Sequence, residues 1–124
     1  MDQQKTTTRV DKPWGWELWW TVTDSYVGKV IFINAGQRLS LQYHEQKDES
    51  VFVIDGEMIL HLEDEAGELQ PIRLGAGEFH RVPVGQCHRF EAVTDTRLIE
   101  VSTPELDDVV RLEDDFGREG TSEP

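Results

Sequence analysis

Residues 36–56 read GQRLSLQYHEQKDESVFVIDG, and this stretch decides the fold. Within it, residues 39–44 alternate between apolar and polar side chains, which is typical of a half-buried β-strand. Residues 50–54 form a second run of β-branched and aromatic residues, and Asp55-Gly56 after it is a strong hairpin signal. The stretch therefore predicts two strands joined by a short polar link and followed by a hairpin.

The same pattern recurs along the chain. Aromatic and β-branched runs separated by turn residues predict strands over 16–23, 26–33, 39–44, 50–54, 58–62, 71–74, 78–82, 88–93 and 97–102. No segment before Pro104 has a helical period, so we expect an all-β sandwich or closed barrel. After Pro104, the sequence ELDDVVRLEDDFGR predicts a short helical or irregular C-terminal segment over the barrel.

Length and charge restrict the class of protein. The 124 residues suit a single domain, 1–124, with a flexible N-terminal arm over residues 1–10 and a loose tail over 119–124. A net charge of −13 with scattered basic residues argues against nucleic-acid binding. The one cysteine excludes an intramolecular disulfide, and no apolar run is long enough for a signal or membrane span. We expect a cytoplasmic protein without membrane contact.

Four side chains predict a metal site. Gln42 and His44 are two residues apart on one predicted strand, so both project from the same face. Glu49 begins the next strand, and His88 begins a later strand that a barrel can bring to the same cavity. Two imidazoles, one carboxylate and one amide oxygen suit one divalent ion, whether Zn²⁺, Mn²⁺, Fe²⁺, Co²⁺ or Ni²⁺.

The residues around these ligands resemble the two signatures of the cupin superfamily. The first comprises Gly36, Gln42-Tyr43-His44, Glu49 and Gly56, with Gln in place of the usual first His. The second comprises Gly77, Pro83-Val-Gly85 and His88. This resemblance implies a double-stranded β-helix, the jelly-roll barrel of cupins, with a metal ion bound inside it.

Within that superfamily the chain is similar to the type II mannose-6-phosphate isomerases. The motifs that carry the similarity are KPWGWE at 12–17, LSLQYH at 39–44, PVGQCHR at 83–89 and DDVVR at 107–111. The resemblance implies an aldose–ketose isomerase for a small sugar phosphate. It also implies a homodimer.

Such an isomerase needs a general base and a group that binds phosphate. Lys47, His80 and Glu100 are candidate catalytic bases by residue type. Arg111, Arg89 and Arg81 are candidate substrate-binding residues, with Arg111 favoured because it lies in the closing motif. Each has a simpler alternative, since Lys47 can be a solvated loop charge, His80 a surface residue and Arg111 an anchor for the acidic tail.

Two other functions stay open at this point. The chain can be a non-catalytic metal cupin that binds a sugar or an organic acid, because no cluster of basic residues is visible in the sequence. It can also be a dioxygenase or lyase, since an open metal position binds oxygen or substrate equally well. The tryptophans at 14, 16, 19 and 20 can stack on a sugar, although core packing or a dimer interface is the more common role.

Overall fold

The computed structural model describes residues 7–122, and every regular element in this range is a β-strand. The strands are β1 (Thr8–Lys12), β2 (Gly15–Val22), β3 (Val27–Ile33), β4 (Leu41–Tyr43), β5 (Glu49–Asp55), β6 (Glu57–Glu63), β7 (Leu69–Gly75), β8 (Phe79–Val82), β9 (His88–Ala92), β10 (Thr96–Ser102) and β11 (Val110–Glu113). Each strand predicted from the sequence is present, with ends that differ by at most two residues. Over the described residues, no helix is long and apolar enough to cross a membrane.

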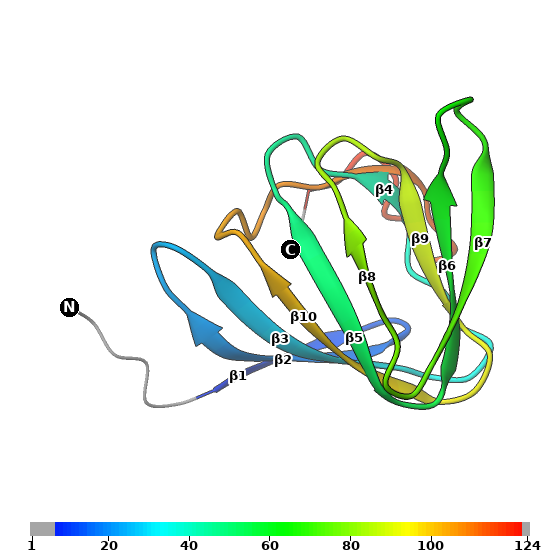
Figure 1. Ribbon diagram of the computed structural model, residues 1–124. Helices are drawn as coiled ribbons and strands as arrows, with labels where there is room; N and C mark the ends of the chain where they lie inside the picture. Colours follow the sequence, from blue (N-terminus) through cyan, green and yellow to red (C-terminus); the bar gives the residue numbers. More distant parts are fainter. Residues whose placement is uncertain (1–6, 123–124) are drawn as a thin grey trace.

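The strands form two antiparallel sheets that face each other across the interior (Figure 1). The six-stranded sheet has the order β1-β2-β3-β10-β5-β8, and the five-stranded sheet has the order β11-β4-β9-β6-β7. Neighbours such as β3 and β10 are far apart in sequence, so long-range pairing dominates the fold. The expected all-β jelly-roll architecture is confirmed.

The interior has an apolar end and a charged end. Ile33, Val53 and Leu98 are fully buried at the apolar end. Further along the same inward-facing rows, β3 places Lys29 and β10 places Glu100, directly opposite each other in the ladder. Because side chains alternate strictly between the two faces of a strand, these charged residues must point into the barrel.

The C-terminal segment is not helical. Val110–Glu113 form β11, which pairs with β4 and places Arg111 opposite Gln42. The helical alternative is therefore wrong within the described residues, while residues 103–109 are irregular as expected. The physical reason is that β-branched residues at 109 and 110 favour a strand, and pairing with β4 satisfies backbone groups of both segments.

Strand pairing and hydrogen bonds reach into both predicted terminal segments. Thr8–Lys12 pair with β2 as β1, so residues 8–10 of the predicted arm belong to a strand, and residues 1–6 lie outside the described residues. In the predicted tail over 119–124, the Gly120 amide donates to the carbonyl of Arg111 at 3.1 Å. Arg111 Nη1 in turn donates to the carbonyl of Thr121 at 3.2 Å. Residues 123–124 lie outside the described residues.

Gly56 closes the hairpin between β5 and β6 with a φ of 91°. A Cβ at this position would lie 2.2 Å from the carbonyl oxygen of Asp95 and 2.8 Å from Cα of Thr96. Gly36 also has a positive φ, 78°, but a Cβ there would meet no atom within 4 Å. Substituting each glycine therefore distinguishes two costs: that of a positive φ, which both positions share, and that of steric overlap, which arises only at Gly56.

We expect Gly56→Ala to destabilise the protein more than Gly36→Ala does. Both substitutions put Ala in the left-handed region, at about 1–2 kcal/mol, and only Gly56→Ala adds an overlap that costs about 1–3 kcal/mol more. Urea denaturation of both variants measures the two free energies of unfolding. Equal losses would show that the contact with Asp95 is relieved at no cost.

Candidate metal centre

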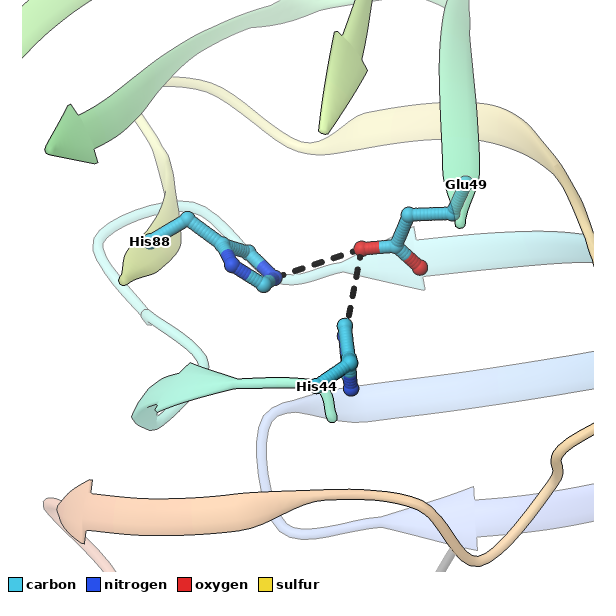
Figure 2. A group of neighbouring side chains, drawn as sticks. All are labelled: His44, Glu49 and His88. Atoms are coloured by element: carbon cyan, nitrogen blue, oxygen red, sulfur yellow. Dashed lines mark ion pairs between the residues drawn. The ribbon is translucent and has the colours of Figure 1, made fainter. Parts of the chain in front are cut away.

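Three buried side chains converge inside the barrel: His44, Glu49 and His88 (Figure 2). Oε1 of Glu49 lies 3.2 Å from Nε2 of His88 and 3.5 Å from Nε2 of His44. One potential ligand atom from each residue lies within 4.8 Å of the other two. Metal–ligand bonds are about 2.0–2.2 Å long, so one ion can contact all three side chains after small adjustments.

The sheet register explains why these residues meet. Gln42 on β4 lies opposite His88 on β9, and His44 follows β4 directly. Glu49 is the first residue of β5, which belongs to the other sheet. The site is therefore built from both sheets and depends on closure of the barrel.

Hydrogen bonds to the backbone orient both imidazole rings. His44 Nδ1 lies 2.6 Å from the carbonyl oxygen of Asp108, and His88 Nδ1 lies 2.9 Å from that of Gln86. Because a carbonyl oxygen can only accept, each Nδ1 carries a proton and donates it. In a neutral imidazole the lone pair then lies on Nε2, on the side of Glu49.

These Nε2 atoms are the evidence that a cation fits. Both are buried, and neither makes a hydrogen bond. Two lone pairs that face a carboxylate need a positive charge between them, and backbone acceptors behind the rings are the usual support of metal-binding histidines. His44, Glu49 and His88 can therefore hold a divalent metal ion.

Gln42, the predicted fourth ligand, lines the same cavity as His44 and Glu49. Its Oε1 accepts a hydrogen bond from Oγ of Ser40 at 2.6 Å. An amide oxygen has two lone pairs, so this bond orients the group and leaves one acceptor position. Its role as a ligand stays a prediction.

Lys47 lies beside the triad and is buried, so the interpretation as a solvated loop charge is wrong. Its Nζ is 3.2 Å from Oε2 of Glu49 and 3.2 Å from Oε2 of Glu100. Burial alone would lower the pKa of Lys47, but the charges of Glu100 and Glu49 outweigh burial and raise it. Lys47 is therefore an ammonium group held between two carboxylates.

The two carboxylates differ in their pKa. Burial opposes ionisation of Glu49, but the charge of Lys47 outweighs it and holds the pKa of Glu49 well below the ordinary value. For Glu100, burial and the negative charge of Glu49 raise the pKa to about 7, against the opposing charges of Lys47 and Lys29. Glu49 is thus fully ionised near neutral pH, whereas Glu100 is close to its midpoint there and can both accept and release a proton.

A small cavity of about 50 Å³ opens beside the triad. Among the described residues, the cations that line it are Lys12, Lys29, Lys47, Arg111 and Arg118. The acidic residues that line it are Glu17, Glu49, Glu100 and Asp108. The cavity is therefore strongly polar and brings together cations that are scattered in the sequence.

The fold and this site agree with a comparison to known families. The cupin domain family matches residues 29–102, more than half of the chain and the range that holds His44, Glu49 and His88. The chain belongs to the cupin family.

This cupin is similar to a curated protein called polyketide synthase CurC, from Streptomyces cyaneus. The two are 33% identical over 73 residues, which are 59% of this chain and 44% of that protein. The chain therefore matches less than half the length of this relative.

Solved structures share the fold at low sequence identity. KdgF from Halomonas sp. superposes with a TM-score of 0.70 at 20% identity, over 78% of this chain and 87% of that one. Oxalate decarboxylase from Bacillus subtilis gives 0.74 at 17% identity, over 86% and 30% of the two chains. The capsular polysaccharide assembling protein CapF from Staphylococcus aureus gives 0.72 at 19% identity, over 87% and 34%.

The other predicted site residues divide into two groups. Arg111 lines the cavity of this cupin, as do Lys47 and Glu100. His80 and Arg81 on β8 do not line it, since Arg81 pairs with Asp48 at 2.7 Å on the exposed surface.

His80 and Arg89 both contact backbone carbonyl oxygens. His80 Nδ1 lies 2.6 Å from the carbonyl oxygen of Arg81. Arg89 is also absent from the cavity lining, and its Nε donates to the carbonyl of Leu39 at 2.8 Å. The geometry therefore gives these three residues no direct access to the cavity.

A second charged pair in the cavity was not predicted from the sequence. Lys29 Nζ lies 3.2 Å from Oε1 of Glu17, and both side chains are buried. Trp19 Nε1 donates to the same oxygen at 2.9 Å. A signal for this pair exists in the sequence, because Lys29 shares a strand face with Ile31 and Ile33, where a charge is unexpected.

Trp14 is both a core residue and a cavity residue. It is 2% exposed and lines the cavity next to Lys12. Trp16 instead stacks on Phe32 with ring centroids 5.5 Å apart. Of these two aromatic residues, only Trp14 is in a position to contact a ligand.

We expect His88→Ala to abolish tight binding of a divalent metal, while the matched substitution His61→Ala leaves it intact. His61 is a partly exposed histidine that pairs with Glu91 at 2.9 Å. It lies opposite Arg89, one position from His88 in the register of β6 and β9, so its side chain points to the other face of the sheet. Loss of an outer-shell partner costs about 10- to 100-fold in metal affinity, so loss of a ligand should cost at least as much. Calorimetric titration of metal-stripped protein with Zn²⁺ and Mn²⁺ measures the difference.

The same samples give a second readout. A metal that binds only the folded state raises the melting temperature of the wild type and of His61→Ala. Equal metal affinity in His88→Ala and the wild type would show that the ion binds elsewhere.

Proposed function

We propose that this cupin is a metal-dependent isomerase that interconverts the aldose and ketose forms of a small sugar phosphate. The observation that carries the proposal is that two members of the triad, His44 and Glu49, share one cavity with Lys47, Glu100 and a set of cationic side chains. The motifs at 12–17, 39–44, 83–89 and 107–111 support the same reaction and substrate class.

Isomerisation moves a proton between neighbouring carbon atoms, from the hydroxyl-bearing C2 of the aldose to C1 of the ketose. When bound at the triad, a divalent ion would supply electrostatic stabilisation of the substrate oxygens that gain negative charge. Glu100 is the residue we assign to the proton transfer, because its carboxyl group is buried and lines the cavity. It takes the proton from C2 and returns it to C1, while the hydroxyl proton of O2 is transferred to O1, so that the C2 hydroxyl becomes the ketose carbonyl and the C1 carbonyl becomes a hydroxyl.

Lys47 has a different role in this scheme. It is protonated and lies 3.2 Å from both Glu49 and Glu100, so it positions the two carboxylates. His80, the third candidate base, does not line the cavity. Of the three predicted bases, the geometry therefore favours Glu100.

A second candidate is a lyase or decarboxylase that acts on a small carboxylate. The cavity volume of about 50 Å³ favours this reading, because it is small for a whole sugar phosphate. Oxalate decarboxylase shares the fold, and one of its solved structures belongs to a study of its Mn(II) centres. An open position on the metal would accept a carboxylate oxygen.

We expect the metal-loaded protein to interconvert mannose 6-phosphate and fructose 6-phosphate, with solvent deuterium incorporated at C1 of fructose 6-phosphate and at C2 of mannose 6-phosphate. Glu100→Gln should lower kcat by about 100- to 10,000-fold, the usual contribution of a general base, while metal binding is retained. The matched control is Arg73→Met, which changes an exposed residue paired with Glu57 on the five-stranded sheet. NMR spectroscopy in D₂O measures turnover and exchange together.

Other outcomes decide between the alternatives. Decarboxylation of oxalate without conversion of any sugar phosphate would favour the second candidate. Tight binding of a sugar phosphate without turnover or deuterium exchange would show that the protein is a binding module.

We also propose that the protein is a homodimer. The outer face of the six-stranded sheet carries an apolar row, in ladder order Leu18, Val30, Ile99, Phe52 and Phe79. Phe79 is 71% exposed and stacks on Phe52 with ring centroids 6.4 Å apart. Exposed apolar patches of this kind commonly mark protein contacts.

A further inference from the structure

A group of cations lines the cavity on the β1, β3 and β11 side. It comprises Lys12 at the end of β1, Lys29 on β3, Arg111 on β11, and Arg118 in the C-terminal segment. Within this group, Lys29 lies 3.2 Å from Glu17 and Arg118 lies 2.8 Å from Asp114. The sign of this group is opposite to that of the whole chain, which has a net charge of −13.

The cations are close enough to affect one another. Burial lowers the pKa of Lys12, and the charges of Lys29, Arg111 and Arg118 lower it further, against the opposing charge of Glu17. Positive charges held together in a partly buried cavity repel one another, and a bound anion relieves that repulsion.

Its neighbours hold the Lys29 side chain in a position from which it can contact a bound anion. Its Nζ lies 3.2 Å from Glu17 and 5.0 Å from the ring centroid of Trp19. Trp19 in turn donates a hydrogen bond to Glu17. A buried ion pair costs desolvation that a well-packed apolar pair avoids, so stability alone gives no reason for charges at these two positions.

The group also lies at a useful separation from the triad. Lys29 is opposite Glu100 in the ladder of β3 and β10, and β10 lies between β3 and the strand that begins with Glu49. Two strand spacings correspond to about 10 Å. An open-chain sugar phosphate can span such a distance, with its carbonyl end at the triad.

We propose that Lys12, Lys29 and Arg111 form a subsite that binds the phosphate group of the substrate. This inference rests on the proposed function, whose substrate class it makes specific. Two ammonium groups and one guanidinium group match the several terminal oxygens of a phosphate, because Lys acts as a point charge and Arg as a planar fork. A carboxylate offers only two oxygens and would leave donors of the subsite without acceptors.

The test is a calorimetric titration of metal-stripped protein with inorganic phosphate, compared with malonate. Two variants remove positive charge from the subsite: Lys12→Met, and the double variant Glu17→Gln with Lys29→Met, which leaves no buried charge unpaired. We expect each variant to bind phosphate at least tenfold more weakly than the wild type. Arg73→Met, which removes one exposed cation from the other sheet, should bind phosphate like the wild type.

His88→Ala separates this subsite from the metal centre. It should lose metal affinity but still bind phosphate, since His88 does not line the cavity where the cations lie. Phosphate affinity that is unchanged in both subsite variants would overturn the proposal, and so would a wild type that binds no phosphate or binds malonate more tightly.

The two proposals can fail separately. Phosphate binding through these residues in a protein that isomerises nothing would support the subsite and contradict the isomerase. An active isomerase whose subsite variants keep the wild-type KM for mannose 6-phosphate would support the isomerase and contradict the subsite.

Discussion

The hydrogen bond from Nδ1 of His44 to the carbonyl oxygen of Asp108 is the constraint on which the metal centre depends. The carboxylate of the same Asp108 accepts hydrogen bonds from the amides of Glu45, Gln46 and Lys47, at 3.0, 2.7 and 2.8 Å. Burial would raise the pKa of Asp108, but these amide donors outweigh it and lower the pKa. One residue of the C-terminal segment thus sets the tautomer of a ligand and the shape of the loop between β4 and β5.

The interior of the barrel has one end filled by apolar side chains and another that contains buried charges. Apolar residues such as Ile33, Val53 and Leu98 fill one end and supply the hydrophobic stabilisation. At the other end, residues of alternating charge cross the six-stranded sheet and the adjoining loop, in the order Glu49, Lys47, Glu100, Lys29 and Glu17. Each buried charge costs several kcal/mol of desolvation even after relaxation, so this half of the core is not explained by a contribution to stability.

Two features of the interior support the proposed anionic small-molecule ligand. The imidazole and carboxylate donors are arranged for a cation, and the cavity wall carries cationic side chains, although the whole chain has a net charge of −13. An acidic exterior does not attract anions from a distance, so selectivity for an anion has to come from the cavity itself. The cationic side chains there come from β1, β3, β11 and the loops, and only barrel closure makes them neighbours.

The strands, the turns and the candidate metal ligands could be predicted from the sequence. Period-two alternation is a local property, and so is the demand for glycine at a position such as Gly56, so both are readable without tertiary structure. His44, Glu49 and His88 were predictable because their motifs place each one at a strand end. The two terminal strands were not predicted. β1 is polar and exposed, and β11 lies in an acidic segment whose composition also suits a helix.

Tertiary structure alone decided which residues share the cavity. Alternation assigns Lys29 and Glu100 to inward faces, but only the register of β3 and β10 places them opposite each other. In the same way, pairing of β11 with β4 brings Arg111 beside Gln42, although 69 residues separate them in sequence. Strand order and register arise from burial summed over the whole barrel, and no local stretch of sequence contains that information.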